Sequence, residues 1–261
     1  MRSADNKLFI YEKCQLVETI CQLRFPAILS IETKVPADFQ DLIRGAFPRY
    51  ECRAETVNVN GGGKQTVKNH CFFSPDGSSR INLTKDFVSL STVRYTGWDS
   101  FAHMLDEPLG QLIQVYKPAY FERIGLRYLH GFSRTLLGLE DRRWNDLIQP
   151  QYLGVLDDDN IDEASVSRCT VDVERQLDER CKLRLHAGPG NVQRTVRNGN
   201  QVQTLNEPEP RFILDLDVFA GGKLRLESAA ETLEQLHGHA DRLFSEAITD
   251  TLHEAMDPTE L

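Results

Sequence analysis

The chain has 261 residues, of which 40% are hydrophobic, enough to bury the core of one large domain or of two closely packed halves. Its 30 Lys and Arg residues against 39 Asp and Glu residues give a net charge of −9, which argues against binding of a nucleic-acid backbone by the whole surface. The six cysteines contain no Cys-x-x-Cys pair, and no apolar run approaches the roughly 20 residues of a membrane-spanning helix. With no leader pattern at its start either, the chain is expected to be a cytoplasmic globular protein without a membrane partner.

The first half shows two kinds of periodicity, alternation of apolar and polar residues for strands and helical spacing for helices. The predicted elements are a strand at 15–25, a helix at 36–47, strands at 51–60 and 68–74, a long strand or hairpin at 80–95, and a helix at 98–115. Gly61-Gly62-Gly63 reads as a flexible hairpin tip between two of these strands.

The stretch from Tyr120 to His130 is predicted to be the central strand. Ile124, Leu126 and Tyr128 fall on one side and should face the core. Arg123 and Arg127 fall on the opposite side, where they are free for polar interactions.

Residues 18–25 resemble this central strand, since they also open with Glu and close on Leu-Arg-aromatic.

The second half then continues with a short helix near Trp144, an acidic mobile loop at 157–163, a hairpin at 166–187, a polar excursion up to Pro210, a strand at 211–219 and a helix at 229–256. Each half thus reads as strand, helix, three strands, helix. We predict an α+β fold of two related halves, 1–117 and 118–261, packed as a single globular unit. Its sheet should be curved and antiparallel or mixed, with helices mainly on one face.

Three motifs carry a resemblance to a known group: Arg80-Ile-Asn-Leu-Thr, Tyr95-x-x-Trp98-x-x-Phe101, and Phe121-x-Arg123-Ile-Gly-Leu-Arg-Tyr128. With them the chain resembles, nearly end to end, a sporadically distributed family of uncharacterised bacterial proteins of similar length. The patchy occurrence of that family is similar to that of genes on mobile or defence-associated elements. The resemblance implies no established activity, and His130 departs from the Asn expected after the third motif.

With the apolar sides of the strands in the core, the opposite sheet face becomes rich in charge. It should carry Glu18, Gln22, Arg24, Arg123, Arg127, Arg168, Asp172, Glu174, Lys182, Arg184, His186, Arg211, Asp215 and Asp217. Cross-strand ion pairs that merely brace the sheet are one interpretation. The other is a recognition site, in which arginine forks grip an anion or a carboxylate. The residues predicted for it are Glu18, Arg24, Arg123, Arg127, Asp215 and Asp217.

Catalytic templates do not match. The Gly-rich stretch before Lys64 lacks the first Gly and the Ser or Thr of a phosphate loop. His237 and His239 lie two positions apart on a helix, so they are expected to be solvated and to form no metal pair. Asp215 and Asp217 share a strand face, where salt bridging to arginine is favoured over metal binding or acid–base work. We therefore expect no metal and no cofactor.

The predicted function is a binding or accessory protein, such as a sensor, inhibitor or antitoxin-like subunit of a mobile-element or defence-type module. It would bind a protein partner or a small polar ligand on the charged sheet face. The alternative is an enzyme that uses the Arg and Asp face on a phosphorylated or nucleotide-like substrate. A catalytic site would need a closed pocket and a strongly shifted titratable group beside a reactive position.

Overall fold

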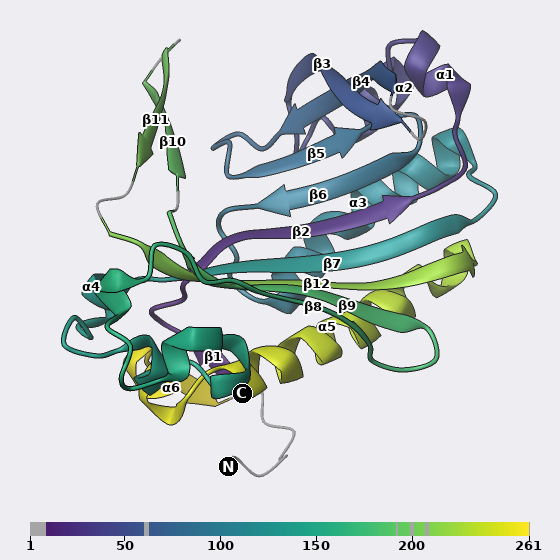
Figure 1. The fold of residues 1–261 in the computed structure, drawn as a ribbon. Coiled ribbons are helices and arrows are strands. Elements are labelled where there is room, and N and C mark those ends of the chain that lie inside the picture. Colours follow the sequence, from purple (N-terminus) through teal and green to yellow (C-terminus); the bar gives the residue numbers. More distant parts are fainter. Residues whose placement is uncertain (1–8, 60–62, 192, 199–200, 207–208, 261) are drawn as a thin grey trace.

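The computed structural model describes residues 9–59, 63–191, 193–198, 201–206 and 209–260 and has an α+β fold built on one nine-stranded sheet (Figure 1). Every pair of neighbouring strands in this sheet is antiparallel. Across the sheet the strands are β3 (Arg49–Val59), β4 (Gly63–Phe73), β5 (Ser79–Leu83), β6 (Phe87–Thr92), β2 (Leu16–Arg24), β7 (Phe121–Phe132), β12 (Arg211–Leu224), β9 (Cys181–Gly190) and β8 (Val171–Gln176). The predicted antiparallel sheet is confirmed in this coarse form.

The two long helices are α3, which lies behind β6 and β2 in Figure 1, and α5, which packs on β12 and β7. The helices are α1 (Leu29–Thr33), α2 (Ala37–Ile43), α3 (Trp98–Tyr116), α4 (Arg134–Leu137), α5 (Ala229–Ala247) and α6 (Asp250–Ala255). Short 3-10 turns η1 to η5 occupy Trp144–Asp146, Pro150–Tyr152, Gly154–Asp157, Glu163–Ser165 and Leu226–Ser228. The helical face buries the apolar sides of the strands, and the opposite face is left open.

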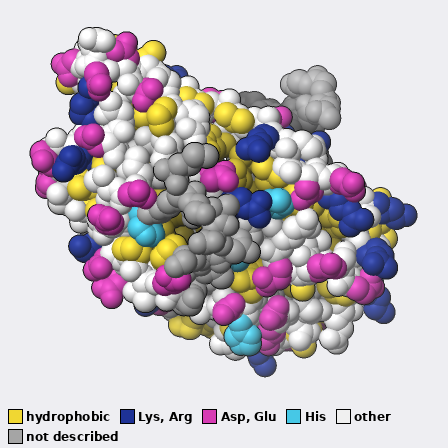
Figure 2. All heavy atoms as spheres, turned by 90° about the horizontal axis from the view of Figure 1, so that it is seen from below, with side chains coloured by type: hydrophobic (Ala, Val, Ile, Leu, Met, Phe, Trp, Pro, Cys, Tyr) yellow, Lys and Arg dark blue, Asp and Glu magenta, His cyan; other side chains and the backbone are white. Residues whose placement is uncertain are grey.

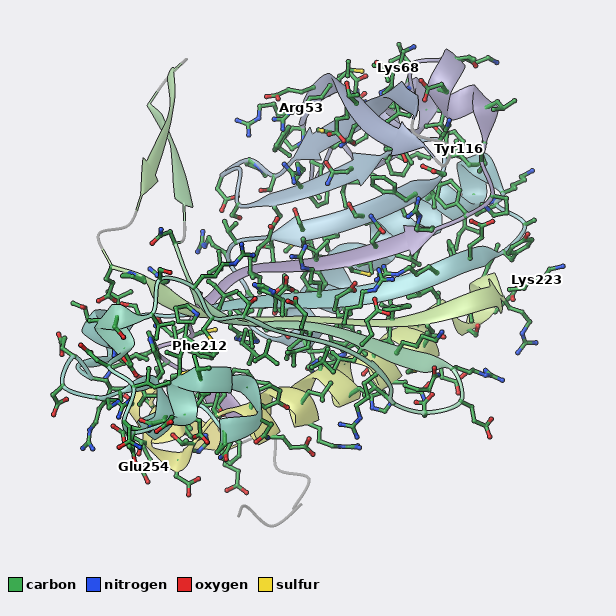
Figure 3. All side chains as sticks on the ribbon, in the orientation of Figure 1. Arg53, Lys68, Tyr116, Phe212, Lys223 and Glu254 are labelled. Atoms are coloured by element: carbon green, nitrogen blue, oxygen red, sulfur yellow. The ribbon has the colours of Figure 1, made fainter. Side chains whose placement is uncertain are left out.

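Strand alternation sets the contents of the core, as period-two side-chain geometry requires. In β7, Ile124 and Leu126 are fully buried and Tyr128 is buried. Arg127, which lies between Leu126 and Tyr128 in sequence, is exposed. Phe212 starts the buried row of β12 and packs on Trp144, with ring centroids 5.4 Å apart (Figure 3). The core rows predicted for both strands are therefore confirmed.

Residues 80–95 form a hairpin rather than one long strand. Thr84 ends β5 and turns the chain, because its hydroxyl donates to the Asp86 carboxylate and accepts from the Phe87 amide. The Gly-rich tip predicted at 61–63 lies largely outside the described residues, which resume at Gly63 with β4.

The C-terminal segment is two helices, so the single helix predicted for 229–256 is wrong. Ile248 leaves the helix in an extended conformation and forms a β-bridge with Ile148. Thr249 then starts α6, where its side chain accepts a hydrogen bond from the Leu252 amide. Pairing with a distant segment ends α5 even though the apolar stripe continues.

The acidic loop at 157–163, predicted to be mobile, is bonded to Arg143, which donates to the backbone carbonyls of Asp158, Asp159 and Ile161. One further prediction needs correction. The polar excursion before Pro210 contains the hairpin of β10 (Gln193–Asn198) and β11 (Gln201–Asn206). Near the chain ends, β1 (Phe9–Tyr11) pairs with β13 (Pro258–Glu260), a contact that the sequence did not indicate.

The predicted division into two related halves is not confirmed, because the parts of the chain before and after residue 117 differ in content. From the centre outward the strand order is β2, β6, β5, β4, β3 on one side and β7, β12, β9, β8 on the other. The first half thus has four strands after its helices instead of three, and the second has 3-10 turns and an inserted hairpin. The β2–β7 ladder joins them, with a shift of register between Leu16 and Glu18.

The surface carries mixed charge. Seen from below, acidic side chains are spread across the molecule and basic ones lie among them (Figure 2). No helix in the described part of the chain is long and apolar enough to cross a membrane. All six cysteines lie within the described residues and are free.

Candidate functional site

The open face of the sheet carries the residues predicted for a recognition site. Arg127 on β7 lies opposite Ile20 on β2 and opposite Asp217 on β12. Asp215 lies two positions before Asp217, on the same side of β12. Two strands that are far apart in sequence therefore bring these charges onto one surface.

Arg127 and Asp215 form a two-pronged ion pair. The Nε of Arg127 donates to Oδ1 of Asp215 at 2.7 Å, and Nη2 donates to Oδ2 at 2.5 Å. These hydrogen bonds, followed by the charges of Asp215 and Asp217, raise the pKa of the Arg127 guanidinium. Such parallel bonds fix the orientation of both side chains.

Arg123 forms the second ion pair, with Asp217. Its Nη2 donates to both carboxylate oxygens, at 2.6 and 2.7 Å. To reach Asp217, the Arg123 side chain lies across Gly125. A Cβ atom added at Gly125 would come within 2.2 Å of Arg123 Nη1. The guanidinium also lies over the ring of Phe219, 4.4 Å from the centroid. Gly125 therefore leaves the space that the Arg123 guanidinium occupies.

Neither arginine bonds to the residue directly opposite it on β12. Arg127 faces Asp217 but holds Asp215, and Arg123 faces Gly221 but holds Asp217. Both side chains lean in the same direction along the sheet. As a result, the forks that were predicted to grip an external anion are occupied by carboxylates of the same chain.

Arg24 and Glu18 lie on the same face but outside these two pairs. Arg24 is opposite Arg123 in the β2–β7 ladder, and its guanidinium makes an ion pair of 3.5 Å with Asp86 in the β5–β6 turn. Glu18 adds to the raised pKa of Arg127 through its charge, after the larger effect of Asp215. The structure thus groups four of the six predicted residues and places these two beside them.

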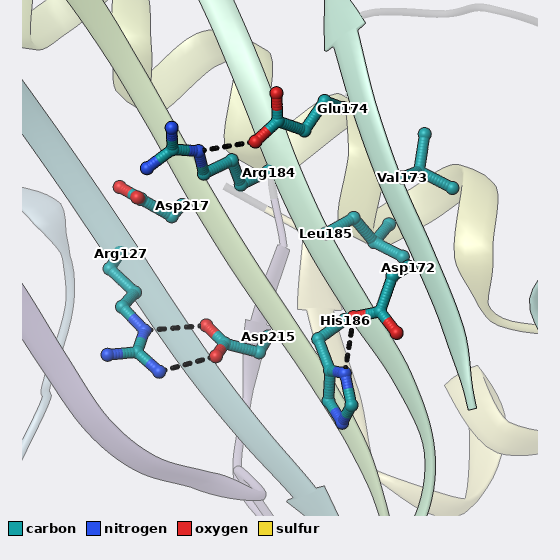
Figure 4. A pocket seen from close by; sticks show the side chains of 9 residues that line it. All are labelled: Arg127, Asp172, Val173, Glu174, Arg184, Leu185, His186, Asp215 and Asp217. Carbon is teal, nitrogen blue, oxygen red and sulfur yellow. Dashed lines mark hydrogen bonds and ion pairs between the residues drawn. The ribbon is translucent and has the colours of Figure 1, made fainter. Parts of the chain in front are cut away.

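The charged surface continues onto β9 and β8. The Nε of Arg184 donates to Glu174 at 2.8 Å, and His186 Nδ1 lies 2.7 Å from an oxygen of Asp172. These pairs and the neighbouring strands enclose a hollow of about 370 Å³ (Figure 4). Its lining residues are Arg127, Asp172, Val173, Glu174, Arg184, Leu185, His186, Asp215 and Asp217. We refer to this feature as the acidic hollow, because four carboxylates line it against two guanidinium groups.

Alternation in the sequence already placed Asp172, Glu174, Arg184 and His186 on the charged face, but it did not select them for the site. The strand order explains why. β9 pairs with β12, although β10 and β11 separate the two strands in sequence. A local pattern contains no signal for such a pairing.

The histidines of α5 and β7 are not solvated, contrary to the sequence-based expectation for His237 and His239. His237 stacks on Trp98 at 4.6 Å, and its Nδ1 lies 3.0 Å from the Tyr128 hydroxyl. Burial lowers the pKa of His237. Nε2 of His239 lies 2.7 Å from Oδ2 of Asp178. Both side chains are parts of packed clusters on the helical side of the sheet.

His130 lies inside the core. It stacks on Phe244 with ring centroids 4.5 Å apart, and burial lowers its pKa to about 3. This residue faces away from the acidic hollow, because it shares the core side of β7 with Leu126 and Tyr128. The role of His130 is therefore in packing on the helical side.

The chain was compared with known proteins. No protein-family model matches it, and no curated protein matches it.

Proposed function

We propose that this protein is a binding module, and that its acidic hollow holds a partner segment that presents Arg or Lys side chains. The observation that carries this proposal is the charge balance of the hollow. Four carboxylates line it, and arginines pair with three of them, Arg127 with Asp215, Arg184 with Glu174 and Arg123 with Asp217. Asp172, which lies beside His186, is left as one negative charge in excess. An ionised carboxylate accepts up to about four hydrogen bonds, so a carboxylate already paired with an arginine still has lone pairs for a second cation. Asp172 and Glu174, on the edge strand β8, are the most exposed of the four.

An anionic ligand fits the hollow less well. Each guanidinium that lines it already holds a carboxylate of the same chain, Arg127 through Asp215 and Arg184 through Glu174. A phosphate would have to displace one of these carboxylates before it gained an arginine fork. This cost weighs against the alternative of an enzyme for a phosphorylated or nucleotide-like substrate.

The role of such a module is that of a cytoplasmic accessory, inhibitor or sensor subunit. Six free cysteines support a reducing compartment. The resemblance to a patchily distributed bacterial family supports a place in a mobile-element or defence-type module. A partner protein is favoured over a small ligand, since the hollow is lined in part by β8, which is an edge strand of the sheet among the described residues.

We also propose that the sheet arose by internal duplication. In both halves the first strand pairs with the last strand before the long helix, β2 with β6 and β7 with β12. In both strand pairs, core residues lie opposite core residues. Leu23 lies opposite Val88 in the first pair, and Leu126 lies opposite Val218 in the second. A superposition of the halves that leaves β2 and β7 unmatched would contradict this origin.

The binding proposal predicts the effect of reversing charge at the acidic hollow. A labelled peptide of alternating Arg and Ser should bind the protein, more weakly as salt rises, and the same peptide with Glu in place of Arg should not. In the double variant Asp172→Lys, Glu174→Lys, affinity for the Arg peptide should fall by at least about tenfold, or about 1.4 kcal/mol, in a fluorescence anisotropy titration. Both side chains are exposed, so the variant should fold.

The control is Glu231→Lys, Glu246→Lys, which makes the same change in net charge on exposed positions of α5. The control variant should bind the Arg peptide with nearly unchanged affinity. An equal loss of affinity in both double variants would mean that the peptide responds to the net charge of the protein and not to the acidic hollow. Asp215→Asn separates recognition from bracing, because it keeps the size of the side chain and removes one carboxylate from the hollow. Recognition predicts a lost affinity at an unchanged melting temperature. A lowered melting temperature with normal affinity per folded molecule would mean that the pair only braces the sheet.

A further inference from the structure

A second cluster of chemically capable side chains lies on the helical side of the sheet, away from the acidic hollow. It consists of Asp178 in the β8–β9 turn, Cys181 at the start of β9 and His239 on α5. Their ligand-type atoms, a carboxylate oxygen, a thiol sulfur and an imidazole nitrogen, all lie within 4.8 Å of one another. Cys181 is fully buried and the other two side chains are half-buried.

Asp178 is held in place by its neighbours. Its Oδ1 accepts hydrogen bonds from the amides of Arg180 and Cys181, both at 2.8 Å. Its Oδ2 lies 2.7 Å from His239 Nε2, and the side-chain Nε2 of Gln235, one helical turn before His239, donates to the same oxygen at 3.1 Å. The carboxylate therefore has one oxygen committed to the turn and the other directed at the imidazole.

We propose that Asp178, Cys181 and His239 bind a zinc ion. Thiolate, imidazole and carboxylate are the three ligand types that zinc takes from proteins, at about 2.3, 2.0–2.1 and 2.0–2.2 Å. At tetrahedral angles these bond lengths separate the ligand atoms by about 3.4–3.6 Å. To reach these separations, the 2.7 Å distance between Asp178 Oδ2 and His239 Nε2 must widen by less than about 1 Å. The largest distance between two ligand atoms of the cluster, up to 4.8 Å, must shorten by about 1 Å, and side-chain rotation allows both changes.

One of the three ligands, Asp178, can be reached from solvent. Asp178 also lines a cleft of about 580 Å³ between the β8–β9 turn and the end of β12, with Arg180 and Gly222 among its other residues. Three protein ligands and an open position are typical of zinc sites that exchange a water molecule. Gln235 supports such a site, because it orients the Asp178 carboxylate from outside.

A simpler role for the cluster is to fasten the turn to α5. That role needs Asp178, Gln235 and His239, but it does not need a thiol. Cys181 therefore separates the two roles, since a thiolate is a strong zinc ligand and a serine hydroxyl is a poor one. Cys181→Ser changes the chemistry with little change of volume.

The test uses the full chain without a histidine tag, stripped of metal with a chelator. Zinc should bind with one-to-one stoichiometry in a calorimetric titration and should raise the melting temperature. Cobalt used as a probe should show a thiolate-to-metal charge-transfer band in the near ultraviolet. Gln235→Ala should weaken zinc binding by about tenfold, as expected for a residue that only orients a ligand. Cys181→Ser should weaken it more and should abolish the cobalt band.

Cys71→Ser is the matched control, because Cys71 is also a buried strand cysteine but lies outside the cluster. It should keep both the zinc affinity and the cobalt band. Absence of stoichiometric zinc binding in the wild-type chain would overturn the proposal, and so would equal zinc affinity in wild type and Cys181→Ser. In either case the cluster would be a fastening of the β8–β9 turn only.

Discussion

At the scale of single residues, Gly125 sets the geometry of the charged face. It is extended and not strained, so its importance comes from the missing side chain and the close approach of Arg123. The ordinary expectation for Gly in a strand is that Ala would stabilise it. Here the expectation reverses, since the added methyl group and the Arg123 guanidinium need the same space.

Gly125→Ala should therefore lower the free energy of unfolding by about 1–3 kcal/mol, because it displaces a half-buried charged hydrogen-bond donor from Asp217. Urea unfolding followed by circular dichroism measures the change. Gly238→Ala is the control: this exposed helix position has open space for a Cβ, and the variant should be stabilised by about 0.5–1 kcal/mol. A Gly125→Ala variant as stable as wild type would show that the Arg123–Asp217 pair contributes nothing.

His130 should make stability depend on pH. Its pKa is about 6.5 in the unfolded chain and about 3 in the fold, where burial disfavours the charged form. Between these values only the unfolded chain takes up the proton, so stability is full above pH 6.5 and falls with decreasing pH by about 1.4 kcal/mol per unit. From pH 7 to pH 5 the loss from this residue is about 2 kcal/mol.

Comparison with His130→Phe, which keeps the stacking on Phe244, isolates this effect. Between pH 7 and pH 5 the wild type should lose about 2 kcal/mol more than the variant in urea unfolding. The exposed His103 on α3 supplies the control, and His103→Ala should retain the wild-type pH dependence. Parallel pH profiles for wild type and His130→Phe would mean that His130 is already accessible to protons in the native state.

At the scale of elements, pairing with a distant segment ends a helix that the apolar periodicity of the sequence would extend. The apolar stripe of 229–256 suits one helix, yet the Ile148–Ile248 bridge stops α5 at Ala247. Backbone bonds on both sides reinforce the stop, from the Gln149 amide to Ala247 O and from the Thr249 amide to Leu147 O. The hairpin of β10 and β11 is the converse case, in which a polar stretch without an apolar face still forms paired strands.

At the scale of the whole molecule, the β2–β7 ladder makes the halves depend on one another. It pairs Cys21 with Leu126 and Leu23 with Ile124, all fully buried, at the centre of the sheet. Cutting the chain between the halves would leave each with a long unpaired strand edge beside an apolar face, which favours aggregation.

Residues 1–117 and 118–261 should thus be insoluble or molten when expressed alone, and should co-purify as a folded complex when expressed together. Size-exclusion chromatography and the cooperativity of thermal unfolding measure both outcomes. Two fragments that each melt cooperatively as monomers would contradict the dependence and would mean that the halves are separate domains.

The sequence by itself determined the central strands and their faces. Alternation in β2, β7 and β12 was enough to place Arg24, Arg123, Arg127, Asp215 and Asp217 on the side opposite the core, because side-chain direction in a strand depends only on local geometry.

The tertiary structure alone decided which of these charges meet and what lies beside them. The occupation of the Arg127 fork by Asp215, the position of β9 between β12 and β8, and the meeting of Asp178 with His239 all depend on contacts between distant segments. Strand order and register are set by the packing of the whole apolar core, which no local periodicity encodes. A pattern of period two or 3.6 therefore predicts the face of a residue, and only the fold determines its partner.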